Sequence, residues 1–236
     1  MRREDKRTEL RSYGRRRTRR LTERQQSLFD RVGPAVACVA GESQLSPRFR
    51  AALARGACRT WLEIGFGGGE NLIAQAKSNP QVTVVGCEPF VDGCVKAYDA
   101  LEASGVENVF IHNDDARALL DLMPAASLAR VFVLFPDPWP KRRHAKRRLV
   151  GPSLLDRLAR VMTPGGELRV ATDCADYART ILLAVHHHAD FVWTAQRAAD
   201  WTVPPQDWIP TRYEMKATRE GRSSCYFSIM RRPCGS

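Results

Sequence analysis

Short apolar runs alternate with helical stretches from about residue 60 onward. The apolar runs are typical of strands covered on both faces of a sheet, and they lie at Thr60–Ile64, Val82–Cys87, Val109–His112, Val131–Phe135 and Glu167–Thr172. Helical composition separates them over Glu70–Ser78, Val91–Ala103, Ala116–Leu122 and Ser153–Met162, the last closed by Pro164-Gly165-Gly166. This alternation predicts an α/β fold with a doubly wound, mostly parallel sheet and helices on both of its faces.

The last quarter of the chain continues this pattern less regularly. A further helix is expected over Asp176–Ala189, and two further strands over Phe191–Thr194 and Ser224–Met230, with an irregular segment between the strands. The sequence contains no internal repeat. We therefore expect one folded domain over residues 25–236.

The first 24 residues form a separate, basic segment. Residues 2–20 contain nine arginines and one lysine against three acidic residues, and large apolar side chains are almost absent. Such a segment cannot bury enough surface to fold by itself, so residues 1–24 are expected to be a disordered arm without a partner. Contact with RNA is the favoured role, and a nuclear signal or a solvated tail is the alternative.

The composition limits the classes of partner and compartment. Lysine and arginine total 37 against 26 acidic residues, and the net charge of +11 favours a polyanionic partner. The chain lacks an apolar run of about eighteen residues and a signal-peptide core, so no membrane contact is expected. Seven scattered cysteines without a Cys-x-x-Cys pair indicate reduced thiols and a cytoplasmic protein. The run 186–188 of three histidines has no second ligand cluster, so no metal is expected.

An acidic residue stands at or just past the end of each of the first five predicted strands. The five are Glu63, Glu88, Asp115, Asp137 and Asp173. Ligands of open α/β sheets bind outside the carboxyl ends of the strands, so these acids are expected to line one site. A single acid there could be a loop residue or a helix cap, whereas five in register indicate a ligand with positive charge or many donors.

The loop after the first strand is rich in glycine. Gly65, Gly67 and Gly69 permit a tight turn and a close approach of the backbone to a ligand. A dinucleotide loop has the pattern Gly-x-Gly-x-x-Gly and faces a pyrophosphate, where the charges of Glu63 and Glu70 would be unfavourable. The same charges favour S-adenosylmethionine, which carries an ammonium and a sulfonium group.

Glu88 and Asp115 follow the second and third strands. Glu88 lies 23 residues after Gly65, where an acid commonly accepts hydrogen bonds from ribose hydroxyls. This position does not distinguish S-adenosylmethionine from NAD, because both carry a ribose. Asp115 is placed to accept from an adenine amino group, to cap the helix that begins at Ala116, or to do both.

The most distinctive segment is residues 135–148, Phe-Pro-Asp-Pro-Trp-Pro-Lys-Arg-Arg-His-Ala-Lys-Arg-Arg. Prolines on both sides of Asp137 fix backbone angles and remove donors, so the carboxylate is held on a stiff loop. Trp139 follows, and then six lysines and arginines over residues 141–148. An acid, an aromatic plate and phosphate-attracting cations in this order suit the capture of one base of a nucleic acid. An ordinary loop with a solvated basic face is the plainer interpretation.

Taken together, these motifs resemble those of the tRNA (guanine-N7-)-methyltransferases, a family of class I methyltransferases with a Rossmann-like fold. The resemblance covers most of the chain and rests on Ser12–Arg16, Leu62–Gly67, Gly86–Phe90, Phe135–Lys141, Ala171–Asp173 and Thr211–Glu214. Its Pro-Asp-Pro-Trp-Pro-Lys element is highly specific, whereas many methyltransferases share the glycine loop. Arg212-Tyr213 stands where the family often has Lys-Phe, which keeps the basic and aromatic characters.

The resemblance implies a methyltransferase domain that transfers a methyl group from S-adenosylmethionine to N7 of a guanine in tRNA, in the variable loop. The implied cofactor site consists of Glu63, Gly65, Gly67, Gly69, Glu88, Asp115 and Asp137. Asp137 is also the catalytic candidate. The implied tRNA contacts are Lys141, Asp173, Thr211, Arg212, Tyr213 and Glu214.

Guanine N7 suits such a site because it carries a free lone pair and no proton. No general base is needed, so catalysis would depend on alignment and electrostatics. Asp137 would stabilise the positive charge that moves from sulfur to the purine, or it would bind the guanine through its N1–H and amino group. Trp139 would stack on the base or close the loop against the core. The sequence leaves both choices open.

Three other functions are alternatives. Exocyclic-amine RNA methyltransferases have a loop with two adjacent prolines, whereas Asp137 separates the prolines here. An NAD-dependent oxidoreductase is disfavoured by Glu70 and by the lack of an evident hydride-transfer site. A non-enzymatic RNA-binding module would gain nothing from the five acids. The sequence is compatible with a monomer or a homodimer, and no helper subunit is evident.

Overall fold

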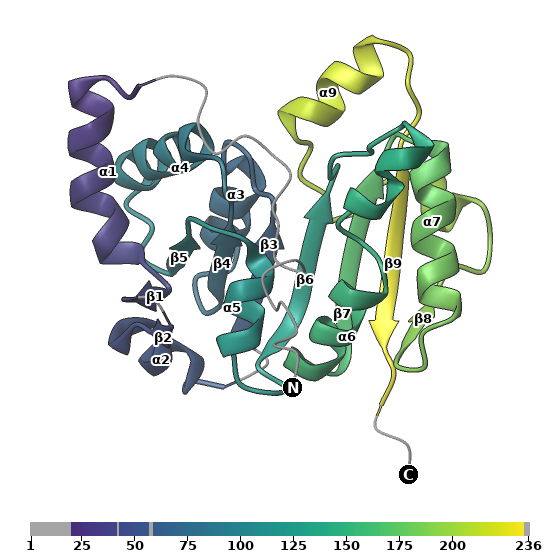
Figure 1. Ribbon diagram of the computed structural model, residues 1–236, viewed down its shortest axis with the longest axis horizontal. Helices are drawn as coiled ribbons and strands as arrows, with labels where there is room; N and C mark the ends of the chain where they lie inside the picture. Colours follow the sequence, from purple (N-terminus) through teal and green to yellow (C-terminus); the bar gives the residue numbers. More distant parts are fainter. Residues whose placement is uncertain (1–19, 42, 57–58, 234–236) are drawn as a thin grey trace, which may run out of the picture.

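The computed structural model describes residues 20–41, 43–56 and 59–233, and in this part of the chain seven strands form one sheet (Figure 1). The strand order is β5-β4-β3-β6-β7-β9-β8. The bounds are Thr60–Ile64 (β3), Thr83–Cys87 (β4), Val109–His112 (β5), Leu128–Leu134 (β6), Met162–Thr172 (β7), Phe191–Trp193 (β8) and Cys225–Arg231 (β9). β9 is antiparallel to both neighbours and the other pairs are parallel, so the predicted mostly parallel sheet is confirmed.

The order of the strands reverses between β3 and β6. From this point β4 and β5 extend the sheet in one direction, and β6 and β7 extend it in the other. Ligands of such sheets bind in the crevice at the carboxyl ends of the two strands where the order reverses. Glu63 lies near the end of β3 and Asp137 follows β6, so the topology brings both acids to this crevice.

Helices cover both faces of the sheet (Figure 1). One layer contains α1 (Glu23–Val36), α3 (Glu70–Ser78) and α4 (Val91–Ser104), and the other contains α5 (Ala116–Leu122), α6 (Pro152–Val161) and α7 (Ala175–His186). Val131 and Val133 pack toward the α5–α7 layer, whereas Phe132 and Leu134 belong to a cluster on the opposite face. This alternation is the period of two that a strand imposes on its side chains.

The fourth predicted helix ends within one residue of its expected end, but Pro164-Gly165-Gly166 does not close it. α6 ends at Val161, and β7 begins at Met162 and continues through Pro164, Gly165 and Gly166. Gly165 has a φ of 78°, and the register between β6 and β7 shifts between Leu128 and Arg130. The Pro-Gly-Gly sequence therefore forms an irregularity inside a strand, where glycine permits the backbone angle, and does not end the helix.

The segment between β8 and β9 is not irregular as predicted. It contains α8 (Ala199–Thr202) and α9 (Arg212–Arg219), which stands above the carboxyl ends of β6 and β7 (Figure 1). The Thr211 hydroxyl accepts from the backbone N–H of Glu214, and the Glu214 carboxylate accepts from the backbone N–H of Thr211. This reciprocal capping box explains why the helix begins after Thr211.

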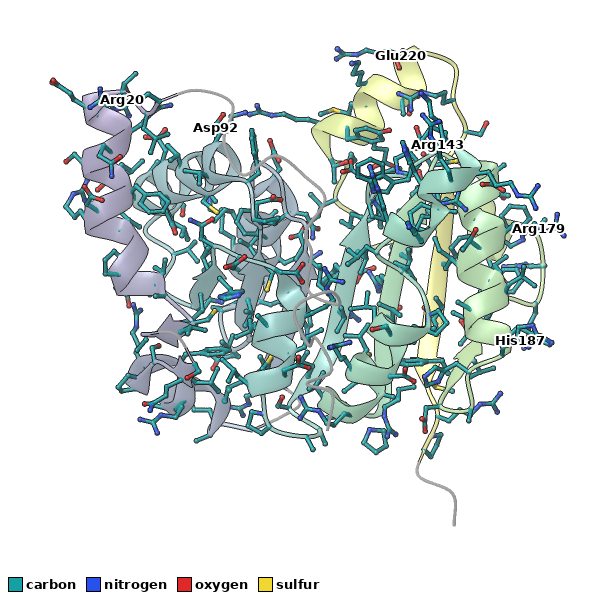
Figure 2. All side chains as sticks on the ribbon, in the orientation of Figure 1. Arg20, Asp92, Arg143, Arg179, His187 and Glu220 are labelled. Atoms are coloured by element: carbon teal, nitrogen blue, oxygen red, sulfur yellow. The ribbon has the colours of Figure 1, made fainter. Side chains whose placement is uncertain are left out.

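The sequence also missed α1, the short helix α2 (Pro47–Leu53) and the two-residue strands β1 (Val39–Ala40) and β2 (Gln44–Leu45). Since α1 begins at Glu23, the last two residues of the expected arm are helical, and residues 1–19 lie outside the described part of the chain. Figure 2 shows Arg20 at the upper left of the molecule and Glu220, which follows α9, at the upper right. None of the described helices combines the length and apolar character that a membrane crossing requires.

Candidate active site

The glycine loop joins β3 to α3 in a conformation that other residues rarely adopt. Gly65, Gly67 and Gly69 all have positive φ angles, of 78°, 56° and 84°. The loop also packs closely on α4, because a Cβ atom on Gly93 would lie 2.4 Å from the carbonyl oxygen of Gly67. The lack of a side chain at Gly93 therefore allows the loop backbone to pack directly on the first turn of α4.

The carboxylate of Glu88 binds the glycine loop. Its Oε2 accepts from the backbone N–H of Gly67 at 2.9 Å, and its Oε1 accepts from the N–H of Phe90 at 3.0 Å. Burial raises the pKa of Glu88, and these two hydrogen bonds oppose the rise. A carboxylate has about four lone-pair positions, so two are left for a ligand such as a ribose diol.

Glu63 is buried beneath the same loop, with 3% of its surface exposed. Its Oε2 accepts from Asn71 Nδ2 at 3.1 Å, and Asn71 Oδ1 accepts from Gln75 Nε2 at 3.3 Å. Burial raises the pKa of Glu63 to about 8, and the charges of Glu70 and Glu88 contribute to the rise. Near neutral pH this carboxyl group is therefore largely protonated in the free protein.

The raised pKa of Glu63 makes stability depend on pH. Between the ordinary pKa of 4.5 and about 8, the unfolded chain loses a proton that the folded chain retains, so stability falls as pH rises. Compared with Glu63→Gln, the wild type should lose up to about 2.7 kcal/mol between about pH 5 and pH 7. Urea unfolding of both proteins across this range measures the difference, and parallel curves would contradict the shift.

Asp115 caps α5, which is one of the two roles predicted for it. Its Oδ1 accepts from the backbone N–H of Arg117 at 2.9 Å, and its Oδ2 accepts from Arg117 Nη2 at 2.6 Å. Burial would raise the pKa of Asp115, but the hydrogen bonds and charge of Arg117 lower it overall. The helix-cap interpretation is confirmed, and contact with adenine stays a prediction.

The loop that carries Asp137 has an unusual backbone. Phe135 and Trp139 have φ angles of 51° and 43°, which are rare for residues other than glycine and are found at functional sites. Asp137 is exposed between them. Burial is the largest cause of the raised pKa values of Glu88 and Tyr213, and the negative charge of Asp137 raises both further. Asp137 therefore lies within electrostatic range of an acid beside the glycine loop and of a tyrosine on α9.

The basic run after this loop divides into inward and outward side chains. It forms the 3₁₀ helix η2 (Arg142–Arg147), and the Arg147 guanidinium lies 4.9 Å from the centre of the Trp139 ring. Arg148, 5% exposed, donates to the Pro138 carbonyl at 3.0 Å and also binds Asp176 of α7. The exposed cations of this run are Lys141, Arg142, Arg143 and Lys146. Arg148 is therefore directed into the protein, and contact of this run with phosphates stays a prediction.

Arg148 should stabilise the fold. Replacement by alanine removes its bonds to Pro138 and Asp176, so the free energy of unfolding should fall by about 2–3 kcal/mol. Arg142→Ala is the matched control, because that side chain is exposed, and should change stability by less than about 0.5 kcal/mol. Equal losses in urea unfolding of the two variants would exclude an anchoring role for Arg148.

Glu214 connects α9 to the sheet. It is 7% exposed, and its carboxylate accepts from the Trp208 indole N–H at 2.8 Å and from the Tyr226 hydroxyl. Burial and this hydrogen bond raise the pKa of Tyr226. Glu214 and Thr211 thus position α9 from within the protein, and their contact with RNA stays a prediction.

Three side chains meet at the end of β7. The Asp173 carboxylate accepts from Arg222 Nη1 and from the Tyr213 hydroxyl, and the Arg222 guanidinium lies 5.5 Å from the centre of the Tyr213 ring. Phe135 packs against this cluster, because its ring centre lies 5.3 Å from that of Tyr213. The cluster therefore joins β7, α9 and the loop of Asp137.

Arg212 reaches from α9 toward the glycine loop. Its Nε lies 2.7 Å from Glu70 Oε1 at the start of α3, although the arginine side chain is 74% exposed. An exposed pair of this kind adds little stability. It does show that a predicted tRNA contact and the predicted cofactor loop are neighbours.

Comparison with known proteins identifies the family. Residues 58–226 match a family model described as "Putative methyltransferase". The tRNA (guanine-N(7)-)-methyltransferase of Rhodospirillum rubrum is 45% identical over 229 residues, which cover 95% of this chain and 89% of that protein. The chain belongs to the tRNA (guanine-N(7)-)-methyltransferase family. The protein of the same name from Ruegeria pomeroyi is 51% identical over 176 residues, which cover 75% of this chain and 74% of that protein.

Solved structures confirm the predicted class I, Rossmann-like fold of this methyltransferase. The aminoglycoside resistance methyltransferase NpmB1 aligns with a TM-score of 0.55 at 18% identity, over 80% of this chain and 94% of that one. The 16S rRNA methyltransferase KamB aligns with a TM-score of 0.53 at 16% identity, over 84% and 99%. At these identities the likeness concerns the fold alone.

The structure of the methyltransferase places every predicted acid at one edge of the sheet, and it adds residues that the sequence analysis did not name. Asn71 binds Glu63, Arg222 binds Asp173, and Trp208 and Tyr226 bind Glu214. Asn71 is the second residue of α3, directly after the glycine loop, so its position in the sequence could have identified it. The other three lie outside every motif, and no sequence pattern identified them.

Proposed function

We propose that this methyltransferase transfers a methyl group from S-adenosylmethionine to N7 of one guanine in the variable loop of tRNA. Its curated relatives carry the name of this reaction. The observation that supports the proposal best is a group of acids without basic partners beside an exposed basic loop. Among the described residues, Glu63, Glu88 and Asp137 form no ion pair with a lysine or arginine.

These acids fit S-adenosylmethionine better than a dinucleotide. A cationic ligand would offset the repulsion and burial that raise the pKa values of Glu63 and Glu88, whereas a pyrophosphate would increase the repulsion. Glu88 retains acceptor positions for ribose hydroxyls, and the backbone of Gly65 and Gly67 has open space beside it. When bound, S-adenosylmethionine supplies an electrophilic methyl carbon, which the N7 lone pair attacks while the carbon–sulfur electron pair stays on sulfur.

The protein side chains orient the guanine and stabilise charge. N7 needs no deprotonation, so no side chain has to act as a general base. Asp137 is exposed between two prolines and acts electrostatically on Glu88 and Tyr213, so its charge favours a purine that becomes cationic nearby. Tyr213, 41% exposed and packed on Phe135, offers an aromatic face next to the loop.

The tRNA phosphates would contact the exposed cations of η2 and of the residue that precedes it, namely Lys141, Arg142, Arg143 and Lys146. Arg143 lies at the end of the molecule where α9 stands (Figure 2). The protein acts as a monomer or a homodimer. We place the reaction in the cytoplasm, without a helper subunit or a metal.

Mapping of the methyl group tests this function. Purified protein is incubated with bulk tRNA and labelled S-adenosylmethionine, and the RNA is then cleaved with borohydride and aniline, which cut at N7-methylguanosine. Label at a cleavable guanine in the variable loop is the expected result. Label that resists this cleavage would indicate an exocyclic amine, and label at a cleavable guanine elsewhere would contradict the proposed position.

A further inference from the structure

The three side chains of the cluster of Asp173, Tyr213 and Arg222 differ in their exposure to solvent. The Asp173 side chain is 6% exposed, whereas Arg222 is 36% exposed and Tyr213 41%. A molecule that approaches the end of β7 therefore meets an arginine and an aromatic ring before it meets the carboxylate. Nothing in the methyl-transfer chemistry requires Arg222, which lies beyond the last family motif.

The Asp173 carboxylate presents both of its oxygens in one direction. The Tyr213 hydroxyl lies 3.5 Å from Oδ1 and 3.4 Å from Oδ2, so it approaches between the two oxygens at long hydrogen-bond distances. Arg222 binds Oδ2 from another side. A ligand with two adjacent N–H donors would bind both oxygens of the carboxylate at this position and would displace the Tyr213 hydroxyl.

The guanidinium of Arg222 has donors to spare. Nη1 contacts Asp173 and the Tyr213 oxygen, and Nη2 donates to Glu220 at 2.6 Å. An arginine has five N–H donors in one plane. The cluster therefore presents a cationic donor next to an acceptor pair, with the ring of Tyr213 beside them.

This order of groups complements the Watson–Crick edge of guanine, which has the O6 acceptor next to the N1–H and N2–H donors. Adenine has a donor at position 6 and an acceptor at N1, so the same cluster would reject it. Enzymes that modify a base commonly recognise this edge. Its recognition also leaves N7, on the other edge of the purine, free for the methyl group.

We propose that Arg222 is a specificity-determining residue: paired with Asp173, it donates to O6 of the target guanine while the carboxylate accepts from N1–H and the amino group. The inference rests on the proposed function and deepens it. It also assigns guanine recognition to the end of β7, which leaves Asp137 to act on the developing charge.

The test uses tRNA assembled from synthetic pieces with one altered base at the mapped target position. Guanosine and inosine both carry O6 and the N1 proton, whereas 2-aminopurine lacks both, and all three keep N7. Arg222→Met should reduce kcat/KM for guanosine and inosine by roughly 10- to 100-fold, the loss expected for one hydrogen bond from a charged donor. The reduction for 2-aminopurine should be less than about threefold.

Arg219→Met is the matched control, because Arg219 is an exposed arginine on the same segment without a bond to Asp173. This control should change kcat/KM for all three substrates by the same small factor. Arg222→Lys keeps the charge and replaces Arg222→Met if that variant does not fold. Its kcat/KM should again fall for the bases that carry O6 and not for 2-aminopurine. An equal loss for all three bases would show that Arg222 has only a structural role. A wild type that leaves guanine N7 unmethylated would instead contradict the proposed function.

Discussion

Asp137→Asn is expected to lower kcat by roughly 100- to 1,000-fold and to leave the KM for tRNA within about threefold. The substitution keeps the shape of the side chain and removes its charge. Asp137 makes no ion pair with another described side chain, and its charge is felt by both Glu88 and Tyr213. In the proposed reaction, a fixed negative charge at this position would stabilise the transition state, in which positive charge moves onto the purine.

Steady-state kinetics with tRNA and S-adenosylmethionine separates this role from binding of guanine. Asp156→Asn is the control, because Asp156 is a highly exposed acid on α6, outside the proposed site, and should keep the wild-type kcat. A rise in KM without a change in kcat would assign Asp137 to guanine positioning and would contradict the role of Arg222. Normal values of both constants would remove Asp137 from the catalytic site.

The strands of the sheet were predictable because they are buried on both faces. Continuous apolar runs such as Thr60–Ile64 and Val109–His112 leave little choice of structure, and both were predicted with the observed bounds. α9 was missed because it buries only Glu214 and Ala217, which form no apolar stripe. Its Thr-x-x-Glu cap was nevertheless visible in the sequence, as was the corresponding cap at Thr22.

The acids of the site were predictable for a topological reason. Parallel strands end at the same edge of a sheet, so acids that follow different strands, such as Glu88 after β4 and Asp173 after β7, lie along one edge. Their partners were not predictable, because they depend on packing between distant segments. Arg222 is 49 residues from Asp173, and Arg148 is 28 residues from Asp176. For the same reason, the sequence did not show which cations of the basic run point inward.

Replacement of the four exposed cations of the basic run, Lys141, Arg142, Arg143 and Lys146, by glutamine is expected to weaken tRNA binding roughly 100- to 1,000-fold near physiological salt. Each phosphate contact releases counterions and contributes about 0.7 to 0.9 to the dependence of log K on log salt concentration. The slope should therefore fall by about 3 when all four contacts are lost. Binding measured at several salt concentrations gives both quantities.

The same variant distinguishes phosphate binding from base recognition. Its side chains are exposed and make no bond to Asp173 or Tyr213, so kcat at saturating tRNA and the methylated guanine should stay unchanged. Glutamine at Arg50, Arg55 and Arg59 removes exposed charge at and after α2, and should change the slope by much less than the loss of four phosphate contacts. An unaltered slope in the four-residue variant would exclude the basic run from tRNA binding. A change of the methylated guanine would mean that this run also sets the register of the tRNA, because phosphate contacts alone carry no information about which base enters the crevice.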